Sequence, residues 1–171
     1  MKLTIREIAL FGILGGLMFA SDMAMEALPN IHLIGVFLIA ATVVYRQKAL
    51  YPLYVYIFLN GIYAGFTLWW IPYLYVWTVL WGVTMLLPQR MPKWLAPVVY
   101  AGVCGLHGLA FGVLYAPAQA LLFGMNGQQT LAWIAAGLPF DVIHAVGNTV
   151  CGLLIGPLIV ILRKTKEPID G

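Results

Sequence analysis

Long apolar stretches, separated by short connections, constrain this chain more than any other feature of its sequence. Of its 171 residues, 63% are hydrophobic and only 9% are charged, whereas a soluble globular domain is about 25% charged. A chain this apolar cannot cover a water-exposed surface, so lipid is the expected solvent, and a bilayer requires spans of about 20 apolar residues. We therefore expect an all-α integral membrane protein that forms a single membrane domain over residues 1–171.

The apolar pattern predicts six transmembrane helices. Their approximate bounds are 6–27, 30–45, 49–66, 71–88, 93–115 and 139–162. The second span is short for a bilayer, so it must thin the membrane locally or recruit flanking residues. Residues 116–138 are less regular, and we expect them to form an outer loop with a short helix that caps the bundle. Pro139 fits the first turn of the last helix, where a missing N–H costs nothing.

All nine basic residues lie at alternate ends of these spans. They are Lys2, Arg6, Arg46, Lys48, Arg90, Lys93, Arg163, Lys164 and Lys166. Because basic residues mark the cytoplasmic side of a membrane protein, both termini are expected in the cytoplasm. The net charge of +3 then belongs to the inner rim of the bundle, and no nucleic-acid-binding surface is predicted.

Three of the six acidic residues fall on the opposite, outer side. These are Asp22, Glu26 and Asp141, whereas Glu7, Glu167 and Asp170 lie among the basic residues. Asp22 and Glu26 are four residues apart, so they share one face near the outer end of the first helix.

The stretch AGLPFDVIHAVGN, residues 136–148, places three polar groups in a very apolar segment. Asp141, His144 and Asn148 are spaced i, i+3 and i+7, so they share a face that extends about 10 Å along the helix. Ionisable residues at membrane depth are costly and mark function more often than in soluble proteins. There are local alternatives: Asp141 caps its own helix end or pairs with His144, and Asn148 joins two helices.

Polar and aromatic stripes on three other spans face the same region. The stripes are Tyr56, Asn60, Tyr63 and Thr67; Tyr73, Trp77, Trp81 and Thr84; and Tyr100, Cys104, His107 and Phe111. Together they predict a pocket that opens to the outside and binds a small flat molecule. The expected substrate-binding residues are Glu26, Asn60, Tyr63, Trp69, Trp70, Tyr73, His107, Asp141, His144 and Asn148. Alternatively, the aromatic residues form an interfacial belt, Asn60 joins helices, and His107 is a satisfied bundle histidine.

The sequence lacks the common motifs of enzymes. It contains no H-E-x-x-H, no G-x-S-x-G and no glycine-rich phosphate loop with a lysine. The three histidines and scattered carboxylates lack metal-ligand spacing, and Cys104 and Cys151 fit small buried hydrophobes. We therefore predict a non-enzyme with no catalytic residue, metal site or cofactor, so any ATP would have to be used by partner subunits.

Two longer stretches carry a resemblance to a transporter family. They are ALFGILGGLMFASDMAMEALPNIHLIG, residues 9–35, and AGLPFDVIHAVGNTVCGLLIGPLIVIL, residues 136–162. With six short spans, they resemble the substrate-binding S component of energy-coupling factor (ECF) vitamin transporters over essentially the whole chain. The resemblance implies a multi-pass protein of the bacterial plasma membrane that captures a vitamin or related nutrient from outside. It also implies delivery by toppling on a transmembrane coupling subunit, which two cytoplasmic ATPases drive.

The resemblance further implies a docking face and a binding region. Many S components carry an Ala-x-x-x-Ala face on the first helix for the coupling subunit, and the matching residues are Gly12, Gly16, Ala20 and Ala24. Two glycines replace alanines in this face, and small-x-x-x-small spacing is also an ordinary packing signal. Substrate in this family usually binds near the outer face, beneath the loops between spans 1–2, 3–4 and 5–6.

The outer side offers three carboxylates and no lysine or arginine, and this predicts the charge of the ligand. Because an anionic vitamin normally requires a basic partner, we expect a neutral or cationic heterocycle stacked on tryptophan or tyrosine. Two other functions stay open. The first is a small membrane enzyme or proton-coupled carrier that uses Asp141 and His144 as a proton relay without any ATPase. The second is a purely structural membrane subunit.

Overall fold

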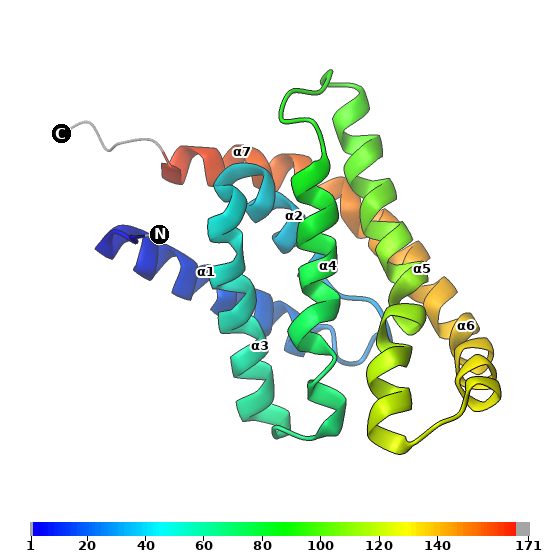
Figure 1. Cartoon of the computed structure of the whole chain (residues 1–171). Coiled ribbons are helices and arrows are strands. Elements are labelled where there is room, and N and C mark those ends of the chain that lie inside the picture. Colours follow the sequence, from blue (N-terminus) through cyan, green and yellow to red (C-terminus); the bar gives the residue numbers. More distant parts are fainter. Residues whose placement is uncertain (1, 167–171) are drawn as a thin grey trace.

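The computed structural model describes residues 2–166, which form an all-helical bundle (Figure 1). The α-helices are α1 (Ile5–Ala24), α2 (Ile34–Tyr45), α3 (Leu50–Ala64), α4 (Tyr73–Leu86), α5 (Leu95–Phe123), α6 (Gly127–Cys151) and α7 (Ile155–Lys166). Short 3-10 turns are η1 (Arg46–Ala49), η2 (Leu68–Trp70) and η3 (Gly152–Leu154). No strand occurs within residues 2–166, which confirms the all-α class for this part of the chain. Glu167 and Asp170, expected at the inner rim, lie outside the described residues.

Four helical stretches are long and apolar enough to cross a membrane. They are Ile5–Ala24, Ile34–Ala64, Leu95–Phe123 and Gly127–Lys166. The second stretch combines α2, η1 and α3, but the chain turns at Arg46, where φ is 56° and ψ is −121°. As a result α2 and α3 are separate rods (Figure 1). With 12 and 14 residues, α2 and α4 are shorter than a usual span of about 20 residues.

The stretch expected to span the membrane from residue 30 becomes helical only at Ile34. Pro29 has no backbone donor, and Asn30 adopts a positive φ of 60°, so the chain forms turns before α2 begins. This connection carries His32 to the bundle. In α2 itself, ten of the twelve residues are buried, because the helix packs against α1, α4 and α7.

Residues 116–138 do not form the expected outer loop. Instead, α5 continues through Pro117 to Phe123, and Gly124 ends it in a left-handed conformation with φ 63°. After this short turn α6 begins at Gly127, where the side chains of Asn126 and Gln129 form a capping box. The expectation failed because these end and start signals specify a tight helical hairpin, in which Pro117 is tolerated within a helix.

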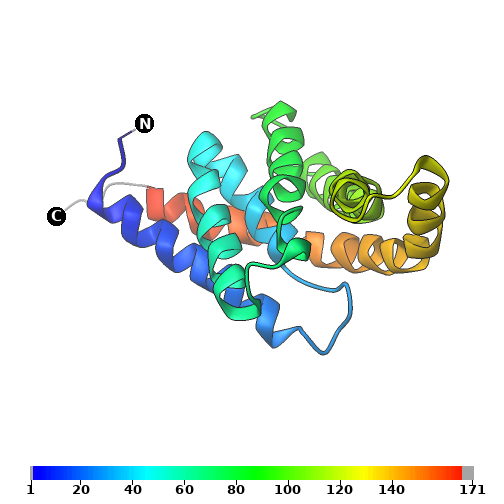
Figure 2. The same ribbon diagram turned by 60° about the horizontal axis from the view of Figure 1, so that its bottom comes forward.

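Pro139 lies inside α6 rather than in the first turn of a helix. Figure 2 shows that α6 changes direction, so that its first turns lie across the remainder of the helix. A proline removes one backbone hydrogen bond and is the ordinary cause of such a bend. The polar face of residues 141–148 therefore belongs to the middle and later turns of α6, not to a helix start.

Glycines bring α5 and α6 into close contact. A Cβ added at Gly108 would lie 2.9 Å from the backbone carbonyl of His144, and one at Gly105 would clash with Thr149. Close approach through small residues is the usual packing mode of membrane helices. It brings Phe111 of α5 against His144 of α6.

Candidate functional site

The three histidines of the protein lie in one group with Trp77 of α4, although they come from different parts of the chain. His32 lies before α2, His107 on α5 and His144 on α6. The ring centroids of His32 and His144 are 4.7 Å apart, those of His32 and Trp77 are 5.3 Å apart, and those of Trp77 and His107 are also 5.3 Å apart. These contacts place the imidazoles of His32 and His107 against the indole of Trp77, and the imidazole of His144 against His32.

Phe111 and Asn148 complete this group. The Phe111 ring lies 4.9 Å from that of His144 and 5.6 Å from that of Trp77. Asn148 follows His144 by one helical turn, and its Nδ2 donates to the carbonyl of Cys104 over 3.4 Å. The six residues are called the histidine–tryptophan cluster below: His32, Trp77, His107, Phe111, His144 and Asn148.

Five buried side-chain atoms have no hydrogen-bond partner in the protein, and all belong to this cluster. They are His32 Nδ1, Trp77 Nε1, His107 Nδ1, His144 Nε2 and Asn148 Oδ1; no other buried side-chain nitrogen or oxygen within residues 2–166 is unpartnered. Each such atom costs about 1–3 kcal/mol of stability. Natural proteins keep unpaired buried groups where function requires them, so the cluster is the candidate binding site.

Four of the five residues that carry these atoms are almost fully enclosed, and His32 is partly buried. Trp77 is 1% exposed, His107 6%, His144 3% and Asn148 0%. One other ring atom is already used, because His107 Nε2 lies 3.0 Å from the carbonyl oxygen of Val76. The five unpartnered atoms of the cluster therefore remain available for hydrogen bonds to a ligand.

His32 lies outside the candidate spans and is uncharged at neutral pH. Burial lowers the pKa of its imidazole to about 3, with smaller contributions from His144 and His107. A neutral imidazole offers one donor and one acceptor, so His32 can adapt to either kind of ligand group.

Asp141 is buried in the contact between α5 and α6. Its Oδ1 accepts a hydrogen bond from the backbone N–H of Gly112 over 3.1 Å, and a Cβ at Gly112 would clash with Oδ2. The alternative in which Asp141 caps its own helix start is wrong, because α6 starts at Gly127. The carboxylate joins two helices instead.

Asn60 belongs to a second polar group, between α1 and α3. Asp22 Oδ2 accepts hydrogen bonds from the Tyr56 hydroxyl over 2.9 Å and from Asn60 Nδ2 over 3.3 Å. Of the outer carboxylates predicted from the sequence, Asp22 is therefore engaged with α3, whereas Glu26 is exposed.

The predicted aromatic residues differ in their surroundings. Tyr73 borders the cluster, with its ring 6.2 Å from Trp77 and 6.4 Å from Phe111. Trp69 contacts Tyr73 at 5.5 Å. Trp70 donates its Nε1–H to the carbonyl of Ile57 over 2.8 Å. Tyr63 is 59% exposed and its ring contacts Phe19.

Among the ten predicted substrate-binding residues, the structure brings His107, His144 and Asn148 into the cluster, and Tyr73 to its edge. Sequence reasoning did not select His32, Trp77 or Phe111 for the site. A signal for two of them was present, since Trp77 and Phe111 belong to the polar–aromatic stripes. His32 could have been selected from the scarcity of histidine, since the chain has only three.

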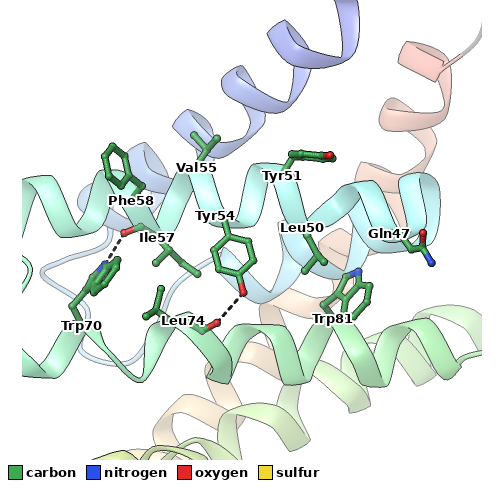
Figure 3. Close-up of a pocket in the computed structure, with 10 residues that line it drawn as sticks. All are labelled: Gln47, Leu50, Tyr51, Tyr54, Val55, Ile57, Phe58, Trp70, Leu74 and Trp81. Carbon is green, nitrogen blue, oxygen red and sulfur yellow. Dashed lines mark hydrogen bonds between the residues drawn. The ribbon is translucent and has the colours of Figure 1, made fainter. Parts of the chain in front are cut away.

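A large groove lies elsewhere, between α3 and α4 (Figure 3). It has a volume of about 970 Å³ and is lined by Gln47, Leu50, Tyr51, Tyr54, Val55, Ile57, Phe58, Trp70, Leu74 and Trp81. Its lining contains no charged residue, and the polar groups of Tyr54 and Trp70 are bonded to the carbonyls of Leu74 and Ile57. This chemistry suits lipid chains, not a polar nutrient.

The small residues expected to dock a partner lie on the free side of α1. A Cβ added at Gly12 or Gly16 would meet nothing within 4 Å, and Ala20 and Ala24 are exposed. The opposite side of α1 packs on α3, where a Cβ at Gly15 would clash with Val55. The described residues therefore leave a smooth helical face uncovered.

Within residues 2–166, no group of three or more His, Cys, Asp or Glu side chains could hold a metal ion. Comparison with family models, with curated proteins and with solved structures found no match to this chain.

Proposed function

We propose that this protein is the substrate-capture (S) subunit of an ECF-type importer. It binds a vitamin or a related small heterocycle from outside and delivers it through a transmembrane coupling subunit and two ATPases. The observation that carries the proposal is the buried histidine–tryptophan cluster, in which five polar atoms have no partner in the protein. A membrane protein with unused hydrogen-bonding capacity among aromatic rings is suited to hold a small polar ring.

The arrangement of the helices supports a six-span topology. In this proposal α1 to α5 each cross the membrane once, and α6 with η3 and α7 forms the sixth crossing. One end of the bundle carries the basic residues. There Lys48 pairs with Glu7, and Lys166 donates to the carbonyl of Val44. In this proposal that end, with both termini, faces the cytoplasm, in agreement with the positive-inside rule, and the membrane is the bacterial plasma membrane.

The free face of α1 supports docking on a partner. Gly12, Gly16, Ala20 and Ala24 leave a smooth strip that another helix can approach closely. In the proposed cycle, the coupling subunit binds this strip, and the whole chain then rotates in the membrane. The rotation moves the cluster from the outer to the inner side. The chain itself supplies binding, and the ATPases supply the energy.

The proton-relay alternative receives less support from the geometry. A relay requires Asp141 to exchange protons with His144, but the Asp141 carboxylate accepts from the backbone of Gly112. The carboxylate also packs so closely on Gly112 that a Cβ there would clash with it. Both contacts indicate that Asp141 joins α5 and α6.

Co-purification tests the proposal. The tagged chain is extracted from its own cells in mild detergent, and the proteins bound to it are identified by mass spectrometry. We expect one membrane coupling subunit and two proteins with nucleotide-binding P-loops. A double substitution Gly12→Leu with Gly16→Leu should remove these partners, because leucines would fill the smooth strip. The control is Gly102→Leu, which also changes a glycine with open space around it, on α5. Recovery of the protein without ATPases, together with transport by the chain alone, would contradict the proposal.

A further inference from the structure

The unpartnered atoms of the cluster also constrain the chemistry of its ligand. Resting on the proposed function, we infer that the ligand is a neutral, flat ring that presents at least one hydrogen-bond acceptor and at least one donor on its edge.

The requirement for an acceptor comes from Trp77. An indole N–H can only donate, and Trp77 Nε1 is buried without a partner in the protein. Two tryptophans that line the groove between α3 and α4 instead donate to backbone carbonyls, Trp70 to Ile57 and Trp81 to Arg46. Trp77 is therefore available to a ligand acceptor, such as a ring nitrogen or a carbonyl oxygen.

The requirement for a donor comes from Asn148 and His107. Asn148 uses its amide nitrogen on the Cys104 carbonyl, so the atom left free is the oxygen, which can only accept. His107 Nε2 faces the Val76 carbonyl, so Nε2 must carry the proton and Nδ1 of the neutral ring is an acceptor. Asn148 Oδ1 and His107 Nδ1 are therefore two free acceptors, which an N–H or O–H group of the ligand can satisfy.

The charge of the ligand follows from what surrounds these atoms. None of the five unpartnered atoms belongs to a carboxylate, lysine or arginine. Asp141 and Asp22 already accept hydrogen bonds from Gly112, Tyr56 and Asn60. A charged ligand buried here would lack a counter-charge, and burying an unpaired charge is far more costly than burying a bonded neutral group.

The rings of the cluster set the shape. Trp77, Phe111 and His107 meet at tilted or edge-on angles, with interplanar angles of 36° to 84° and centroids 5.3–6.1 Å apart. Flat rings pack well against such surfaces, while the histidines His32 and His144 adapt their tautomers to the ligand edge.

Binding by matched probes tests this inference. The purified protein in detergent is dialysed against single compounds at pH 7.5. The neutral set contains nicotinamide, pyridoxine and 4-amino-5-hydroxymethyl-2-methylpyrimidine. The charged set contains nicotinate, biotin and pantothenate as anions, and 1-methylnicotinamide and thiamine as cations. We expect binding from the neutral set only. Trp77→Phe should weaken it about tenfold, whereas Trp81→Phe should leave it within about twofold, since the Trp81 N–H already donates to the carbonyl of Arg46.

Each outcome has a distinct meaning. Tight binding of any charged probe would overturn the inference and leave the proposed function standing, and so would binding of a neutral probe that Trp77→Phe does not weaken. Failure of every neutral probe also overturns the inference. If, in addition, no ATPase subunits co-purify with the chain from its own cells, the proposed function fails as well.

Discussion

The imidazole rings of His32 and His144 meet edge to face with their centroids 4.7 Å apart, although one precedes α2 and the other lies on α6. This contact joins the connection before α2 to α6, and the His32 ring in turn contacts Trp77. Because both rings retain an unpartnered nitrogen, the contact positions hydrogen-bonding groups without using them. Their use by a ligand is the basis of the predictions below.

Replacement of Asn148 by leucine should separate binding from stability. The substitution removes an unpartnered buried oxygen and a long bond of 3.4 Å to Cys104, and it inserts an apolar side chain of similar size. We expect the free energy of unfolding to stay within about 1 kcal/mol of wild type or to rise, while ligand affinity falls about tenfold. Chemical unfolding in detergent and equilibrium dialysis measure the two quantities.

Asn60→Leu is the matched control for that substitution, because Asn60 is also buried but is bonded to Asp22. Its loss should lower the free energy of unfolding by about 1–2 kcal/mol and leave ligand affinity unchanged. If instead Asn148→Leu lowered only the free energy of unfolding and Asn60→Leu lowered only ligand affinity, Asn148 would be structural and Asn60 would belong to the binding site.

Gly108→Ala should destabilise the protein through the contact between α5 and α6. The added Cβ would lie 2.9 Å from backbone atoms of His144, which cannot move aside as a flexible side chain would. We expect a loss of about 1–3 kcal/mol and weaker ligand binding, since the shift displaces His144. Gly102→Ala on the same helix meets nothing within 4 Å and should be neutral or stabilising by up to about 1 kcal/mol. Equal effects of the two variants would contradict the close packing at Gly108.

Asp141→Asn should retain ligand binding. The amide oxygen can still accept from the Gly112 N–H, so we expect affinity within about threefold of wild type and only a small change in stability. The proton-relay alternative requires an ionisable group at this position. Complete loss of function in this variant, with normal folding by circular dichroism, would favour the relay.

Acidification should destabilise the protein partly through His32. Its imidazole stays neutral in the folded protein, where burial lowers the pKa to about 3, whereas in the unfolded chain it takes up a proton below about pH 6.5. Stability is therefore lost as the pH falls from 6.5 toward 3, and the His32 contribution at pH 5 is a loss of about 2 kcal/mol.

The variant His32→Gln tests that contribution. It cannot titrate, so the decline in the free energy of unfolding between pH 7.5 and pH 5 should be smaller than in wild type by about 2 kcal/mol. His144 and His107, which lie close enough to His32 to influence its pKa, remain in the variant, so the difference from wild type reports His32 itself. An unchanged pH dependence would mean that His32 is accessible to water in the folded state.

The helical architecture could be predicted because apolar composition and periodicity are local properties. Each expected span coincides with helix over most of its length, and the structure has four helical stretches of membrane-spanning character. Prediction failed where prolines were taken as helix breaks. Pro117 and Pro139 are accommodated inside α5 and α6, because tertiary packing and a bend can compensate one lost hydrogen bond.

The candidate site could be predicted only in part. His107, His144 and Asn148 were found because a polar side chain in an apolar helix is visible in the sequence. The role of Asp141 in joining two helices could not be predicted, since its bond to the Gly112 backbone depends on how closely α5 and α6 approach. His32 was missed for the same reason, because the course of an irregular connection is set by long-range contacts and not by periodicity.

Native mass spectrometry of the protein, purified in detergent from cells grown in rich medium, tests the central claim most directly. The account predicts one small neutral heterocycle per chain, released on activation in the gas phase and absent from a double variant Trp77→Phe with Asn148→Leu that still folds. A wild-type chain that carries no small molecule and gains none from the neutral probes would contradict it. So would a ligand that the double variant retains at wild-type stoichiometry.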